Sequence, residues 1–61
     1  MNDHYGNDIE VGDDLVYTDE YGNRYIGTVE YDPNYRGGMR VGGRSICDIL
    51  DHCPDVRAYA T

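Results

Sequence analysis

The sequence predicts a single domain of the α+β class that is mostly β and carries one short helix. Residues 5–17 combine an apolar residue, a Gly-Asp turn and an alternating strand, and residues 25–32 form a second alternating run with a glycine near its middle. Residues 45–53 carry apolar side chains at helical spacing. Together these segments are typical of a small SH3-like antiparallel barrel in the order β-β-β-α-β.

The length of the chain limits both its domain count and its function. With 61 residues, it makes one domain near the lower size limit for a fold held by a hydrophobic core. We expect residues 1–8 to be a flexible N-terminal segment and residues 9–61 to form the single SH3-like domain. Because a catalytic cleft would consume much of so small a core, the sequence predicts that the protein is not an enzyme.

The sequence also lacks the signals of a membrane or secreted protein. It has no apolar run long enough to span a bilayer and no signal-peptide pattern. We therefore expect a cytoplasmic protein with no membrane partner.

The first strand and its turn are predicted from alternation. Leu15 and Tyr17 face one side of the strand and continue the parity of Ile9 and Val11, so all four are expected to face the same side. Residues 19–23 (DEYGN) form the turn that follows, because glycine and asparagine tolerate positive φ.

The second strand is predicted over residues 24–31. Its alternation places Tyr25, Gly27, Val29 and Tyr31 on one face. A glycine in mid-strand predicts a bulge or a sharp bend, which a very small barrel needs in order to close.

A loop and two short strands complete the predicted sheet. Residues 32–38 have the composition of a loop, residues 39–41 form a short third strand, and residues 55–60 form the last strand. The residues of the last strand expected to face inward are Val56, Ala58 and Ala60.

The single helix has clear start and stop signals. Ser45 is the predicted N-cap, Asp48 lies in the first turn where a carboxylate favours the positive helix end, and Pro54 stops the helix. One apolar stripe is expected to face the core: Ile46, Ile49, Leu50 and Cys53.

Five segments follow one another in a recognisable order. They are residues 6–13 (GNDIEVGD), 26–32 (IGTVEYD), 37–41 (GGMRV), 45–52 (SICDILDH) and 56–59 (VRAY). In this order they resemble the YopX-like family of small phage and prophage proteins. The chain lacks that family's longer insert before the second strand and its Ile-Gly-Asn-like ending. The resemblance implies a phage-associated accessory protein with a barrel-like fold, acting in the host cytoplasm, and it supplies no catalytic residues.

The charge of the chain is large and uneven. The net charge is −7, and residues 1–32 hold nine acidic side chains against one arginine, a balance of −8. Residues 33–61 hold three acidic side chains against four arginines, a balance of +1. Because nucleic-acid binding depends mainly on neutralising phosphates, this charge disfavours a nucleic-acid partner.

The predicted function is binding of a protein partner through the acidic first hairpin. Asp13, Asp14, Asp19, Glu20 and Tyr21 are the expected contact face, and the expected partner is a host protein with a basic surface. Regularly spaced carboxylates of this kind would imitate DNA phosphates and inhibit that host protein. The alternative for the carboxylates alone is a solvated face that serves solubility.

Two other functions remain open. One is a nucleic-acid-binding small barrel that uses Tyr35, Arg36, Arg40 and Arg44, which lie in a glycine-rich segment. The other is an oligomer-forming structural component, in which the acidic half of one copy meets the arginine-bearing half of the next.

The cysteines and histidines predict neither a metal site nor a cofactor. Cys47, Cys53, His4 and His52 lack a recognised ligand spacing such as paired CxxC. Cys53 lies on the apolar stripe and is expected to be buried, whereas Cys47 lies in the first helical turn, where a reactive thiol is an open alternative to a structural one.

Overall fold

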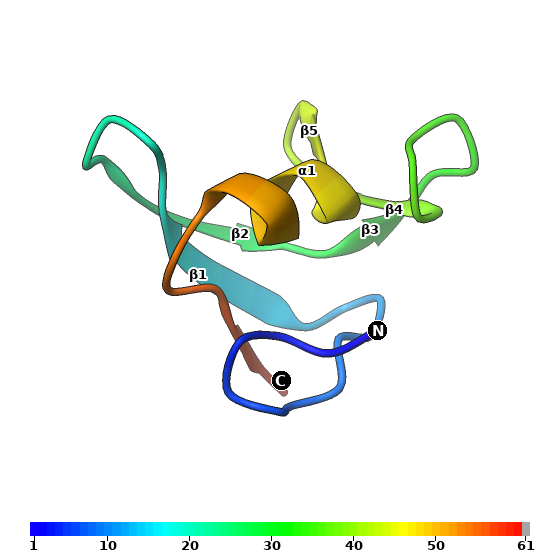
Figure 1. The fold of residues 1–61 in the computed structure, drawn as a ribbon. Helices are drawn as coiled ribbons and strands as arrows, with labels where there is room; N and C mark the ends of the chain where they lie inside the picture. The colour runs from blue at the N-terminus through cyan, green and yellow to red at the C-terminus, as the bar shows by residue number, and fades with distance from the viewer. Residues whose placement is uncertain (61) are drawn as a thin grey trace.

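The computed structural model describes residues 1–60 and shows a mostly β protein with one short helix (Figure 1). One antiparallel sheet has the strand order β2-β1-β6 and the other β3-β4-β5. Within residues 1–60, no ladder joins the two sheets into a closed barrel. Residue 61, the last of the predicted domain, lies outside the described residues. In chain order the elements are β1 (Asp14–Thr18), β2 (Arg24–Thr28), β3 (Glu30–Tyr31), β4 (Met39–Val41), β5 (Arg44–Ser45), α1 (Ile46–His52) and β6 (Arg57–Tyr59).

The strand predicted over 24–31 is two strands that belong to different sheets. β2 pairs with β1 in the first sheet, whereas β3, which follows it after one residue, pairs with β4 in the second sheet. Val29 is the crossing point: it is fully buried, and its N–H donates to the Asp13 carbonyl at 2.9 Å. One stretch of chain thereby contributes to both sheets.

Gly27 permits the close approach of the two sheets near this crossing. A Cβ atom at this position would lie 2.6 Å from Cγ1 of Val41 on β4, which is closer than van der Waals contact allows. The glycine is therefore required by packing, in the strand where the sequence predicts a bend.

The helix forms as the sequence predicts and covers the core. The Ser45 hydroxyl accepts a hydrogen bond from the Asp48 N–H at 3.1 Å, and the helix ends with Cys53 as its C-cap. Ile46 and Ile49 are fully buried, where each contributes about 1.5–3 kcal/mol by leaving water. The buried core is Ile9, Leu15, Tyr17, Val29, Val41, Ile46, Ile49, Cys53, Val56 and Ala58.

Three of the side chains that the predicted alternation places on the same face as core residues are exposed. Val11 is 56% exposed because it lies in a turn, closed by a hydrogen bond from the Asp13 N–H to the Glu10 carbonyl. The turn interrupts the extended chain, so the alternation of β1 does not continue back to Val11. Tyr31 is 68% exposed because it lies beyond the crossing, in the second sheet. Ala60 is exposed because β6 ends one residue before it.

The N-terminal segment is fastened to the last strand by one buried carboxylate. Asp3 Oδ2 accepts the N–H of Ala58 at 2.7 Å, and Asp3 Oδ1 accepts the N–H groups of Tyr5 and Asn7, each at 2.8 Å. Burial acts to raise the pKa of Asp3, but these hydrogen bonds and one from the Asn7 side chain outweigh it and lower the pKa to about 2. The N-terminal loop and β6 consequently lie close together (Figure 1).

Among residues 1–60, no helix has the length and apolar character needed to cross a bilayer.

Candidate functional site

The tip of the β1–β2 hairpin is a tight turn held by its own first residue. The Asp19 carboxylate accepts the N–H groups of Tyr21 at 2.9 Å and Asn23 at 2.8 Å, and the Asp19 N–H donates to the Asn23 carbonyl at 2.8 Å. Gly22 adopts a φ of 84°, a conformation that glycine reaches without strain. Tyr21 is 88% exposed, although its backbone N–H is held by the Asp19 carboxylate.

A second set of contacts anchors this hairpin to the helix. The Arg44 guanidinium donates to both carboxylate oxygens of Glu20, at 2.9 and 2.8 Å, and also binds Asp48. The hydrogen bonds from Arg44 lower the pKa of Glu20 to about 2, and the same pairing raises the pKa of Arg44. The Glu20 charge is thus compensated within the chain, while the backbone of the tip is braced against β5.

The five residues of the predicted acidic face lie at two ends of the same strand. Asp13 and Asp14 are at the start of β1, whereas Asp19, Glu20 and Tyr21 follow its end. Asp19 follows Asp14 by five residue steps of extended chain, a span of about 17 Å. The structure therefore brings Asp19, Glu20 and Tyr21 together and keeps the first two apart from them.

The carboxylates near the start of β1 have few cationic neighbours. Among residues 1–60, no arginine forms a salt bridge with Asp8, Glu10, Asp13 or Asp14. The N-terminal ammonium lies 3.9 Å from the Asp8 carboxylate, and Asp13 accepts the Glu10 N–H at 3.0 Å. This end of the strand carries most of the uncompensated negative charge of the first half of the chain.

The arginines proposed for nucleic-acid binding are bound to carboxylates of the same chain. Arg36 donates to Asp51 at 2.7 Å, and Arg40 contacts Glu30 at 2.9 Å and Asp32 at 3.2 Å. The third arginine forms the hairpin anchor described above. Phosphates would therefore have to displace carboxylates before these side chains could bind them.

Tyr35 belongs to the same charged region. The Arg40 guanidinium lies over the Tyr35 ring, 5.9 Å from its centre, and the Tyr35 N–H donates to the Asp32 carbonyl at 3.1 Å. The ring packs beside a cation that is already paired, so Tyr35 and the three arginines do not form a free basic surface.

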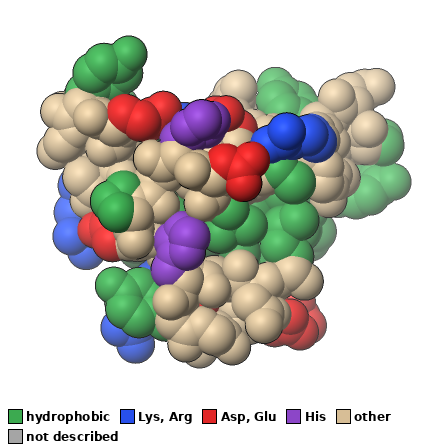
Figure 2. Space-filling model, in the orientation of Figure 1, with side chains coloured by type: hydrophobic (Ala, Val, Ile, Leu, Met, Phe, Trp, Pro, Cys, Tyr) green, Lys and Arg blue, Asp and Glu red, His purple; other side chains and the backbone are tan. Residues whose placement is uncertain are grey.

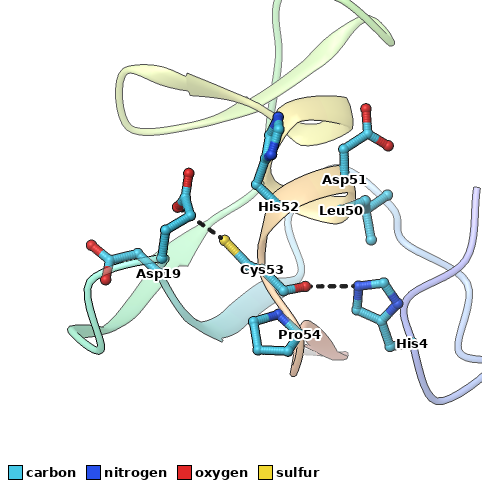
Figure 3. A pocket seen from close by; sticks show the side chains of 8 residues that line it. His4, Asp19, Leu50, Asp51, His52, Cys53 and Pro54 are labelled. Carbon is cyan, nitrogen blue, oxygen red and sulfur yellow. Dashed lines mark hydrogen bonds between the residues drawn. The ribbon is translucent and has the colours of Figure 1, made fainter.

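A wide open hollow of about 620 Å³ lies between the hairpin and the end of α1 (Figure 3). The His4 ring donates through Nε2 to the Cys53 carbonyl at 3.0 Å, and the Cys53 thiol points toward Glu20, with its sulfur 3.9 Å from Oε1. Acidic, basic and histidine side chains gather around the helix on this face (Figure 2).

The chemistry available in this hollow is limited. Burial raises the pKa of Cys53, so its thiol stays protonated at neutral pH, and the side chain is only 2% exposed. Among residues 1–60, no three His, Cys, Asp or Glu side chains are grouped so that they could hold a metal ion. The hollow offers hydrogen-bonding groups but no activated thiolate.

Comparison of the chain with protein-family models, curated proteins and solved structures finds no match.

Sequence reasoning missed three features of this surface and its supports. The Arg44–Glu20 pair and the Asp3–Ala58 hydrogen bond join residues 24 and 55 positions apart, and no local signal marks them. The third feature is the open edge of β2, where Ile26 is 72% exposed. Alternation along the chain does not reveal that β2 lies at the edge of its sheet.

Proposed function

We propose that this protein is a non-enzymatic, phage-type accessory protein that binds a protein partner through its first hairpin. The contact is made by Asp19, Glu20 and Tyr21 at the tip, with Asp13 and Asp14 supplying long-range attraction from the other end of β1. The partner is a host protein with a basic surface, and occupying that surface would inhibit the host protein in the manner of a DNA mimic.

The single observation that carries this proposal is the exposed tyrosine on a braced turn. Tyr21 is 88% exposed, while its neighbours Asp19 and Glu20 are each fixed by two hydrogen bonds. Tyrosine is enriched among the residues that dominate interface energies, and a turn already fixed before binding loses little conformational entropy on binding.

The charge of the molecule supports a basic partner. The net charge is −7, and three of the five arginines are already paired with carboxylates of the same chain. The carboxylates near the start of β1 remain without arginine partners among residues 1–60. A basic surface would be attracted over a distance of about 8 Å at physiological salt, which speeds association and helps to select the partner.

We propose further that the two sheets are the halves of a minimal SH3-like barrel. One stretch of chain passes through both sheets at Val29, and α1 covers the core that they share. A domain of this kind keeps its interior for side chains and presents its loops for binding.

The test is to identify a partner by pull-down from host lysate and then to measure its affinity for three purified proteins. Tyr21→Ser should weaken binding by about tenfold or more, because it removes an anchor side chain. Tyr31→Ser is the matched control, since this tyrosine is also exposed but lies in the other sheet. Affinity should also fall steeply between about 0.05 and 0.5 M salt.

Salt-independent binding, or equal affinities for the wild type and Tyr21→Ser, would overturn the proposal. The two alternative functions have direct assays. A shift of single- or double-stranded probes in low-salt gels would favour nucleic-acid binding, and concentration-dependent sedimentation would favour an oligomer.

A further inference from the structure

We infer that the open edge of β2 binds an extended segment of another protein as an added strand, with an apolar side chain in the hollow beside Gly27 and a carboxylate opposite Arg24. This goes beyond the proposed function, because it concerns a surface other than the hairpin tip. Strand addition of this kind derives affinity from main-chain hydrogen bonds and specificity from pockets for alternate side chains.

The first step concerns the backbone. β2 is an edge strand, paired only with β1 in its sheet. The Val29 N–H donates to the Asp13 carbonyl, so the backbone groups of Val29 point toward the chain that leads into β1. In an antiparallel pair this direction alternates from residue to residue, so Gly27 and Tyr25 also turn their N–H and carbonyl groups toward β1. Arg24 and Ile26 therefore turn theirs outward, and a strand laid along this edge finds a donor and an acceptor at each of these residues.

The second step concerns the side-chain positions that such a strand would meet. On the inner side of the edge, a hollow of about 280 Å³ is lined by Tyr17, Tyr25, Gly27 and Val41, among others. On the outer side, a hollow of about 390 Å³ is lined by Val16, Arg24, Tyr25 and Ile26. Because side chains of an added strand alternate between the two sides, successive residues would enter the inner and outer hollows in turn.

The chemistry of the two hollows defines the occupant. The inner one is bounded mainly by tyrosine rings, aliphatic side chains and glycines, with Arg44 as its one charged residue, which suits an apolar side chain. In the outer one, Ile26 is 72% exposed beside Arg24, which forms no salt bridge among residues 1–60, although its charge helps to lower the pKa of Asp55. A carboxylate in the added strand would give Arg24 a direct partner.

A second copy of this chain does not supply these groups. If two β2 strands paired about Ile26, the residues facing the inner hollows would be Tyr25 and Gly27. Tyr25 is already stacked on Tyr17 with ring centres 5.5 Å apart, and Gly27 has no side chain. Arg24 would lie opposite Thr28, which is uncharged, and both copies carry a charge of −7. A different chain, with its own apolar and acidic residues, fits better.

The edge also lacks most of the features that usually block strand addition. Natural edge strands are protected by proline, charged side chains, a bulge or a covering segment, and the one charged residue of β2, Arg24, lies at its first position. β2 has the sequence Arg-Tyr-Ile-Gly-Thr and pairs with β1 in continuous register. Its central residue is among the most exposed apolar side chains of the described part of the chain.

The test is selection of short peptides from a displayed random library on the full-length protein. The selected peptides should place apolar residues at every second position and carry an acidic residue. Ile26→Pro should raise their Kd by about tenfold or more, because it removes the outward N–H without removing a bond to β1, whereas Ile26→Val, which keeps the N–H, should change it by less than about threefold. Tyr21→Ser should leave their binding unchanged, which separates this surface from the hairpin tip.

Hydrogen exchange of the backbone amides gives a second measurement, which uses the wild-type protein and so does not require that a variant folds. In the wild-type protein, the exchange of the Arg24 and Ile26 amides should slow when a selected peptide binds. The inference is overturned if no peptide is selected, if peptides bind Ile26→Pro as tightly as the wild type, or if these amides are unaffected. It is also overturned if they are already protected in a dimer without peptide, since a second copy would then occupy the edge.

Discussion

Replacing Asp3 by asparagine tests whether one buried carboxylate holds the N-terminal loop to the body of the protein. The carboxylate accepts four hydrogen bonds, two at each oxygen. An asparagine side chain keeps one oxygen but turns an NH2 group, which cannot accept, toward two of the donors. The Asn7 side-chain amide can turn its own oxygen to this group, but a backbone N–H cannot, so at least one backbone N–H loses its acceptor. A hydrogen bond to a charged group contributes about 1.5–3 kcal/mol, and the expected loss of unfolding free energy at pH 7 is about 2–3 kcal/mol.

This loss is large for a chain of this length, for which the whole unfolding free energy is about 3–9 kcal/mol. The assay is urea unfolding followed by circular dichroism at pH 7, with Glu10→Gln as the control. Among residues 1–60, the Glu10 side chain takes part in no salt bridge, so this control should change the unfolding free energy by less than about 0.5 kcal/mol.

The pH dependence provides an independent check on the same residue. The pKa of Asp3 falls from 3.8 to about 2 on folding. A carboxyl whose pKa is lowered by folding stabilises the protein above its unfolded pKa, and this contribution is lost as the pH falls through the folded value. From the size of the pKa shift, this contribution amounts to about 2 kcal/mol. The difference between the wild type and Asp3→Asn should therefore shrink from pH 5 to pH 2.

Two results would refute this reasoning. One is an unfolding free energy of Asp3→Asn within about 0.5 kcal/mol of the wild type at pH 7. The other is a difference between the two proteins that does not change with pH, since the other carboxylates with lowered pKa are present in both.

Three further predictions concern the core, the hairpin anchor and the thiol. Gly27→Ala should lower the unfolding free energy by about 1–3 kcal/mol, because the new Cβ would overlap buried Val41, and an unchanged denaturation midpoint would contradict the packing. In Arg44→Gln, the pKa of Glu20, followed by carboxyl NMR, should rise from about 2 toward 4.5, and a value that stays near 2 would exclude Arg44 as the cause. Cys53 should react with a thiol reagent only on unfolding, because its side chain is 2% exposed and burial raises its pKa, so rapid labelling of the folded protein would disprove its burial.

Several features of the fold could be predicted because their signals are local. The Ser45 cap and the apolar stripe through Ile46 and Ile49 are set by residues within one or two helical turns, and the structure confirms both. The turn after Thr18 and the short strand at residues 39–41 are likewise set by nearby residues and occur where predicted. Such signals act within a few residues and need no knowledge of the rest of the chain.

The placement of charge shows where local signals fail. The sequence separates an acidic half from an arginine-bearing half, and folding pairs them: Glu20 with Arg44, and Glu30 with Arg40. A charge count along the chain does not register these pairs, because it measures position in sequence and not in space. Ion pairs within the chain therefore neutralise part of the positive charge of the arginine-bearing half and part of the negative charge of the hairpin.

By itself, the sequence determined the first strand and its turn, the short strand at residues 39–41, the helix and the side chains that it buries, and the net charge of the molecule, but it gave no sign of β5. Only the tertiary structure decided that residues 24–31 divide between two sheets at Val29, that Asp3 is buried against Ala58, and that β2 is left with an open edge. The physical reason is that each of these depends on contacts between residues far apart in the chain. Their geometry is fixed by how the whole core packs, and not by the preferences of neighbouring residues.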